Sequence, residues 1–535
     1  MKRRLLYLDR LIIISVFFVI FLFILFPIIQ SFYFTFIEEK DAFKVFSDLI
    51  VEHKKTIYNS IMLACLTGIV SSIMSVFVGL SLSFSKGIYY RFLKAIMFIA
   101  MISPPFVMSL TYINLFGRNG FITKEILNLS FNPYGLMGVL IIQSLSYVPL
   151  SSLMIENACY NLNRDVIDAS FDLGKSFFQT LRKIVLPLLW PSIKIVFILN
   201  FMKSISDFST PQIIGGKFQT LASESYLYMV TEGSLLKACI LNIIIFLPCI
   251  FIFYFYKKYN DSIPTNNYNK MSDLKMSGNI LRFVKTIGFV ITFVILLEYL
   301  SLVLEAFTKG RIRDLNFTLE FFIESHMYLR YSFLRSIIYS LFASFISVFL
   351  SSVYVYAKRT INSAFIKKFD YISMLPFAIP GTFFGISYIY AFRSYPFYLT
   401  GTATIIIMNM LFKQFPLSVS SLEDGVNRMD MNLFDAVLDT GRDRIYILKD
   451  VIVPLNLRYI FLGFVNTFIK SMTTVGSIMF LVYPGTKLAT ITLFDVINSG
   501  KYHVGSVIAL YIILFCTVIS LICKYIFNRL EKKDE

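Results

Sequence analysis

Long apolar segments alternate with short polar ones along the whole chain. A helix that crosses a bilayer needs about 20 apolar residues. The pattern predicts twelve such helices, over residues 11–32, 57–84, 92–116, 136–155, 184–205, 236–255, 287–307, 334–356, 372–392, 402–419, 451–472 and 504–526. The third contains Pro104 and Pro105 and the ninth contains Pro376 and Pro380, which a transmembrane helix tolerates when its neighbours or water pair with the freed carbonyls.

The second half of the chain repeats the first. Matching residues lie 267 positions apart: Asp168-Ala169 and Asp435-Ala436, Gly174 and Gly441, Pro187 and Pro454, Lys203-Ser204 and Lys470-Ser471, Leu221-Ala222 and Leu488-Ala489, and Gly233 and Gly500. Six predicted spans fall in each half, and an even number makes the halves parallel. Parallel repeats place a transport pathway at their interface. The sequence therefore predicts an all-α polytopic membrane protein of two pseudo-symmetric six-helix halves.

Composition excludes the soluble classes. Apolar residues make up 56% of the 535 and charged residues only 16%, too few to cover the surface of several soluble domains. The net charge of +17 is divided into short clusters between the apolar runs, which is typical of loops near lipid headgroups. We therefore expect contacts with membrane lipids and no nucleic-acid partner. The three histidines lie far apart and no Cys-x-x-Cys occurs among the six cysteines, so no metal site is expected.

Lysine and arginine are concentrated in alternate turns and at both chain ends. Because such residues favour the cytoplasmic side, both termini are predicted to be cytoplasmic. The apolar run 11–32 is too long for a signal peptide and no small-residue cleavage site follows it, so we interpret it as a retained span. The polar stretch 257–278, which contains Pro264, is typical of a flexible linker between the halves.

The best-matched stretch of the two halves is a polar loop that follows the fourth and the tenth span. The first copy reads Asp168-Ala169-Ser170-Phe171-Asp172-Leu173-Gly174, then nine residues, then Ile184-Val185-Leu186-Pro187. The second reads Asp435-Ala436-Val437-Leu438-Asp439-Thr440-Gly441, nine residues, and Val451-Ile452-Val453-Pro454. Each pattern predicts a short helix, a turn at glycine and a helix that leads into a span beginning near proline.

This spacing resembles the "EAA" loop of permease subunits in bacterial type I ABC importers. The first copy departs from the family pattern at Asp168 and Ser170, and the second at Asp435, Val437, Val451 and Val453. The resemblance implies the type I importer fold in the bacterial cytoplasmic (inner) membrane. It implies type-1 transmembrane domains at 55–256 and 331–524, each after an extra span with a periplasmic segment (1–54 and 283–330), a cytoplasmic linker at 257–282 and a cytoplasmic tail at 525–535.

The same resemblance implies partners and residue roles. Paired ATPase subunits would dock on the two loops, a periplasmic or lipid-anchored solute-binding protein would deliver cargo, and ATP and magnesium would bind those partners, with no cofactor on this chain. The acidic and alanine residues of each loop would contact the ATPases or cap the helices; they are Asp168 and Ala169 in the first loop and Asp435 and Ala436 in the second. The bends would be set by Gly174 and Gly441. The next spans would begin at Pro187 and Pro454. The chain has no phosphate loop of its own, because Phe218 follows Gly215-Gly216-Lys217 and Pro211 takes the place of the first glycine.

Two further segments, Asp207 to Gly216 and Lys470 to Gly485, together with the fused halves, look like permeases for ferric iron. Permeases for 2-aminoethylphosphonate are close to that pattern, and those for thiamine and polyamines are more distant. The expected function is thus uptake of a small solute, ferric iron first, through a non-enzymatic transport subunit.

Lys203 and Lys470 are the polar pair most suited to a pathway. Each lies 16 residues after its proline, about 24 Å along a helix, which suggests a position near the outer face. One interpretation is that both reach lipid headgroups. The other is that they flank the pathway mouth with Ser204, Ser471, Thr473 and Thr474, while Asp207 partly cancels their charge; bare Fe³⁺ would be repelled there and an anion-coordinated metal or a phosphonate would not.

Two other classes of protein remain open. An ion-gradient-driven secondary transporter would need a carboxylate inside a span, and Glu298 is the main acidic residue of that kind. A membrane enzyme would need converging His, Asp or Glu residues, and no predicted span provides such a pair.

Overall fold

The computed structural model describes residues 2–38, 41–117, 120–126, 128, 132–260, 279–309, 316–360, 364–430, 432–440 and 445–534. The described part is almost entirely helical, as predicted. A two-stranded antiparallel ladder, β1 (Thr308–Lys309) with β2 (Asn316–Phe317), is a small addition to the helices. Gly441 and residues 261–278 of the predicted linker lie outside the described residues.

The first half runs from the N-terminus through α13. Its elements are α1 (Lys2–Ile20), η1 (Phe21–Leu25), α2 (Phe26–Tyr33), η2 (Phe34–Glu38), α3 (Ala42–Glu52), α4 (Lys54–Ser83), α5 (Gly87–Ile102), α6 (Val107–Phe116), η3 (Phe121–Ile126), α7 (Leu136–Tyr160), α8 (Arg164–Asp172), α9 (Phe177–Thr180), η4 (Leu181–Val185), α10 (Leu186–Ser206), α11 (Ser209–Ile214), α12 (Leu221–Thr231) and α13 (Leu235–Asn260).

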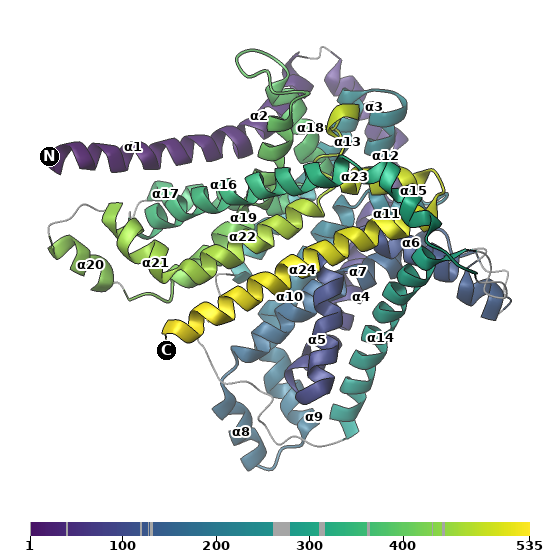
Figure 1. Cartoon of the computed structure of the whole chain (residues 1–535), viewed down its shortest axis with the longest axis horizontal. Coiled ribbons are helices and arrows are strands. Elements are labelled where there is room, and N and C mark those ends of the chain that lie inside the picture. Colours follow the sequence, from purple (N-terminus) through teal and green to yellow (C-terminus); the bar gives the residue numbers. More distant parts are fainter. Residues whose placement is uncertain are drawn as a thin grey trace.

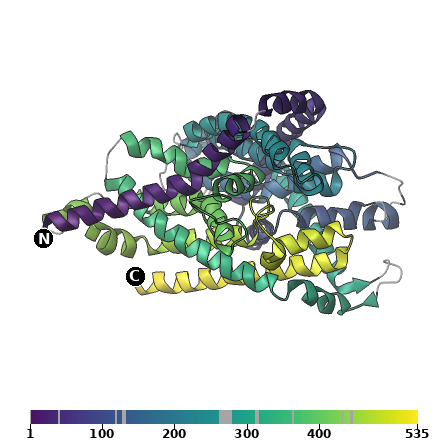
Figure 2. The same ribbon diagram turned by 90° about the horizontal axis from the view of Figure 1, so that it is seen from above.

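The second half repeats this order. Its elements are α14 (Asn279–Phe307), the two strands, α15 (Glu320–Leu329), α16 (Ser332–Thr360), α17 (Ala364–Ala378), α18 (Gly381–Phe392), α19 (Ala403–Val426), α20 (Asn432–Asp439), η7 (Ile447–Ile452), α21 (Val453–Leu455), α22 (Leu457–Met472), η8 (Pro484–Thr486), α23 (Ala489–Asn498) and α24 (Tyr502–Asp534). Both chain ends lie toward the same end of the molecule (Figures 1 and 2).

Nine helices of the described part are long and apolar enough to cross a bilayer, and three bent pairs bring the number to twelve. The third, ninth and eleventh predicted spans are therefore not straight: α5 and α6 meet at 111°, α17 and α18 at 113°, and η7–α21 and α22 at 71°. The first two breaks fall at Pro104-Pro105 and at Pro380. Proline removes a main-chain donor and clashes with the carbonyl four residues earlier, so the helix turns there.

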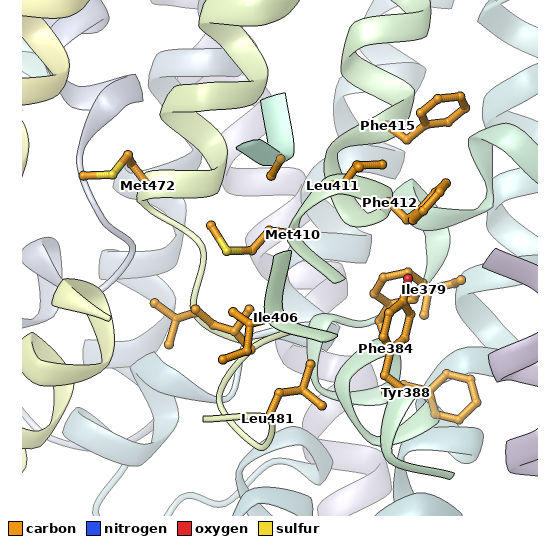
Figure 3. Packing of buried hydrophobic residues seen from close by; sticks show 14 of the residues in the cluster. Ile379, Phe384, Tyr388, Ile406, Met410, Leu411, Phe412, Phe415, Met472 and Leu481 are labelled. Carbon is orange, nitrogen blue, oxygen red and sulfur yellow. The ribbon is translucent and has the colours of Figure 1, made fainter. Parts of the chain in front are cut away.

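Equivalent helices pack alike in the two halves. In the first, α4 lies against α7 and α10, and in the second α16 lies against α19 and α22. The apolar core of the second half forms where α18, α19 and α22 face one another, with Phe384, Phe412 and Met472 among its buried side chains (Figure 3).

The extra span of each half packs on the opposite half. Phe23, in the first extra span, stacks against Phe412 of α19 with ring centroids 5.1 Å apart, and its carbonyl accepts a hydrogen bond from Tyr388 Oη at 2.7 Å. In return, α14 packs along α4, and the Tyr299 hydroxyl lies 2.6 Å from Ser103 Oγ. Each half therefore contributes one helix that packs against the other half, and these two contacts hold the halves together.

Gly288 allows α14 to approach α4 closely. A Cβ added there would lie 2.6 Å from Ser81 Cβ and 3.2 Å from the carbonyl oxygen of Phe77. Small residues permit such backbone contacts between transmembrane helices. We expect Gly288→Leu to lower the unfolding free energy of the purified protein in micelles by about 1–3 kcal/mol, as overpacking does. Val290→Leu, on an exposed part of the same helix, is the control, and equal stability of both variants would contradict this contact.

Candidate functional site: a polar cavity between the halves

A cavity of about 380 Å³ lies between the two halves. Its wall comes from the break between α5 and α6, from α7, from the ends of α10 and α22, and from α19. The polar residues on this wall are Ser103, Gln143, Ser146, Tyr147, Lys203, Ser206, Asp207, Ser209, Thr210, Lys413, Gln414, Lys470, Thr473, Thr474 and Ser477. The cavity is therefore built from equivalent parts of both repeats, as expected for a pathway at a repeat interface.

Two of the three lysines in the wall pair with main-chain oxygens at the broken helices. Lys413 Nζ donates to the carbonyls of Pro376 at 2.7 Å and Ile379 at 2.6 Å. Lys470 Nζ donates to the carbonyl of Met101 at 3.2 Å. The carbonyls of Pro376 and Met101 lack their usual helical donors because Pro380 and Pro105 have no N–H. Lys470 thereby links the second half to the first.

Asp207 is held by hydrogen bonds rather than by a lysine. Its Oδ1 accepts from the N–H of Ser209 at 2.9 Å, from Ser209 Oγ at 2.7 Å and from the N–H of Thr210 at 3.3 Å. Its Oδ2 accepts from Gln143 Nε2 at 3.0 Å. The carboxylate thus organises the turn between α10 and α11.

Lys203 has a different environment. Its Nζ lies 5.6 Å from the centre of the Tyr147 ring. No residue in the described ranges accepts a hydrogen bond from Lys203 or forms an ion pair with it. Lys203 and Lys470 both line the cavity between the halves, and their position relative to the lipid headgroups stays a prediction.

Five of the predicted pathway residues are in the wall: Lys203, Asp207, Lys470, Thr473 and Thr474. Ser204 and Ser471 are buried beside it. Ser204 Oγ donates to Gln143 Oε1 at 2.6 Å, whereas Ser471 Oγ has no partner in the described part of the chain. Whether any of these residues touches cargo stays a prediction.

Sequence reasoning missed Lys413, although one signal could have revealed it. Lys413 is an ionisable residue in the middle of the predicted span 402–419, and such residues are functional candidates by default. Gln143 and Ser477 carried no comparable signal, because their position in the cavity depends on the tertiary fold.

The first polar loop is a pair of short helices joined at glycine. Asn163 caps α8 by accepting from the N–H of Asp165 at 2.9 Å, and Ser176 forms a capping box with Gln179 at the start of α9. Between them Gly174 has φ of +75°, which glycine adopts without strain. A bond of 2.9 Å between the hydroxyls of Ser170 and Thr180 ties α8 to the helix that follows.

The second loop has the same beginning. Asp430 Oδ1 accepts from the N–H of Asn432 at 3.0 Å and starts α20, on which Asp435 and Ala436 are exposed. In the first loop Ala169 is exposed and Asp168 is partly buried. Both loops lie along the left and lower edge of Figure 1, opposite α3, α12 and α15.

Each loop leaves apolar side chains exposed. Leu173, Val166 and Phe178 are exposed on the first, with Leu173 78% accessible, and Leu433 and Leu438 are exposed on the second. Exposed apolar groups rimmed by polar residues are typical of protein interaction sites.

The prolines that follow the loops lie next to π-helical turns. Pro187 is the second residue of α10, which begins where η4 ends. Pro454 is likewise the second residue of α21, which begins where η7 ends. Pro27 follows η1 in the same way. A wider turn removes the clash between the proline ring and the preceding carbonyl. In the first half, the helix consequently continues from Phe177 to Ser206 as one span.

The described residues contain no group of three or more His, Cys, Asp or Glu side chains placed to hold a metal ion. The cavity wall instead presents ammonium, amide and hydroxyl groups, which suit anions and polar solutes better than a bare hard cation.

Comparison with known proteins agrees with this architecture. Residues 71–262 match the family described as "Binding-protein-dependent transport system inner membrane component". This match covers much of the first half of the chain, including the first polar loop, and it fits the many apolar helices of the fold. It agrees with the resemblance to importer permeases that the polar loops suggested.

The similar proteins include iron permeases. The chain is 28% identical to the ferric transport system permease protein FbpB of Actinobacillus pleuropneumoniae, over 84% of this chain and 68% of that protein. It is 28% identical to a putative ferric transport system permease protein, FbpB 1, of Haemophilus influenzae, over 81% of this chain and 71% of the relative. A probable sulfate transport permease, cysT, of Helicosporidium is 25% identical over 35% of this chain and 70% of its own length.

Proposed function

We propose that this chain forms the translocation pathway of an ATP-driven importer whose cargo is ferric iron. The observation that carries the proposal is the cavity between two equivalent halves, with an equivalent polar loop from each half at one end of the molecule. A motor bound to both loops could move the halves relative to each other and open the cavity to alternate sides.

The ATPase subunits are proposed as separate proteins that dock on α8 and α20. Support comes from the exposed apolar side chains of the two loops and from the loops' likeness to the coupling segments of type I importers. A solute-binding protein would dock at the opposite end, where α3, α12 and α15 lie (Figure 1). In this arrangement the loops are cytoplasmic, and so are both termini.

Iron is proposed because two relatives that span most of the chain are named as ferric permeases. The alternatives, 2-aminoethylphosphonate, thiamine and polyamines, would use the same mechanism with a different receptor. The test is reconstitution of the chain in proteoliposomes with its ATP-binding and solute-binding partners. We expect radiolabelled iron to accumulate only with ATP and both partners present.

The rival mechanism is secondary transport, in which an ion gradient rather than ATP drives uptake. Glu298 on α14 gives it a structural basis, because the side chain is 1% exposed and neither carboxylate oxygen has a partner among the described residues. A protonophore distinguishes the two mechanisms. Uptake that survives without the ATPase subunits and stops when the proton gradient is collapsed would overturn the ATP-driven proposal.

A further inference from the structure

The ammonium group of Lys203 is the least satisfied charge in the cavity. An ammonium carries three donors, and an unpaired charge away from water is costly. Lys203 faces the cavity near the end of α10, with the Tyr147 ring at 5.6 Å and no acceptor within the described ranges. The site therefore offers donors that an incoming ligand could use.

The neighbouring charges do not compensate Lys203. Asp207 is the acidic side chain in this wall, and its two oxygens already accept four hydrogen bonds from Ser209, Thr210 and Gln143. Lys413 and Lys470 add two more positive charges, each directed at main-chain carbonyls. With three lysines and one aspartate, the wall has excess positive charge.

We propose that the cavity receives its cargo as an anion, either an oxyanion or a metal ion enclosed in an anionic complex, and that Lys203 contacts it. The inference rests on the proposed function and specifies its substrate class. A small anion fits a cavity of about 380 Å³ and would neutralise charges that are otherwise unpaired. A bare multivalent cation would be repelled by the same wall.

The first test measures uptake by the reconstituted transporter with its partners. Radiolabelled iron supplied as its anionic citrate complex and radiolabelled sulfate are the two probes, which separates a complexed metal from a free oxyanion. We expect Lys203→Met to lower uptake of the accepted probe at least tenfold and Lys203→Arg to retain most of it. Lys194→Met is the matched control, since Lys194 lies on the same helix beside the Tyr259 ring and outside the cavity wall.

The second test does not depend on transport. Thermal unfolding of the complex in lipid nanodiscs is followed with sulfate or ferric citrate, and with chloride at equal ionic strength. We expect the wild type and Lys194→Met to be stabilised by one of the two anions and Lys203→Met to lose that stabilisation while melting normally in chloride.

The two tests separate the two proposals. If the wild type shows no ATP-driven uptake but Lys203→Met abolishes the anion-dependent shift, the proposed function fails and the anion site stands. If uptake is ATP-driven and Lys203→Met leaves it unchanged or increases it, the anion site is wrong.

Discussion

Gly174→Pro is expected to abolish ATP-driven uptake while the chain still inserts and folds. Gly174 has φ of +75° in the turn that joins α8 to α9, and proline is confined to φ near about −65°. Proline would also remove the N–H that donates to the carbonyl of Phe171 at 2.8 Å. The turn must then redirect α8, which is the segment proposed to dock on an ATPase. The readouts are uptake and ATP hydrolysis by the reconstituted complex.

Gly233→Pro provides the matched control. Gly233 also has positive φ, +64°, with open space around it, but it lies between α12 and α13 at the opposite end from the loop. We expect the control to keep ATP-driven uptake, whereas Gly174→Pro alone and Gly174→Pro combined with Gly441→Pro should both lack it. Normal uptake by Gly174→Pro would mean that the first loop does not transmit force.

The repeat and the spans could be predicted from the sequence because they depend on local composition. Twelve apolar runs correspond to nine straight spans and three bent pairs, and the loop helices begin at their polar caps, such as Asn163 before α8. The prolines of the third and ninth spans were visible too. The size of the resulting bends, 111° and 113°, could not be predicted, because it depends on what pairs with the freed carbonyls.

Those partners come from remote parts of the chain. Lys470 reaches the carbonyl of Met101 across the interface between halves, a contact between residues far apart in sequence that periodicity cannot reveal. The packing of α14 against α4 of the other half, with Gly288 next to Ser81, could not be predicted from the sequence for the same reason. The lysine pair was recognised from the repeat, but the sequence could not show that both lysines line one cavity with Lys413, because that depends on how the two halves pack.

Lys413→Met is expected to be the most destabilising single change in the cavity wall. Lys413 provides the donors for two carbonyls at the break between α17 and α18, at 2.7 Å and 2.6 Å. Methionine fills a similar volume but donates nothing, so both oxygens lose their partner. Each buried carbonyl left unpaired costs about 1–3 kcal/mol, which outweighs the relief from removing one of three nearby positive charges. We expect a loss of about 2 kcal/mol or more in the unfolding free energy, measured by denaturation in micelles.

Lys470→Met serves as a comparison variant for which we expect a smaller loss of stability. Lys470 satisfies one carbonyl, at the longer distance of 3.2 Å, so its replacement should cost about half as much or less. Lys413→Arg retains donors and should recover part of the stability, limited by the larger guanidinium. If Lys413→Met were as stable as the wild type, the break at Pro380 would not depend on this lysine. The bend would then be held by packing alone, and Lys413 would be free to serve the cargo alongside Lys203.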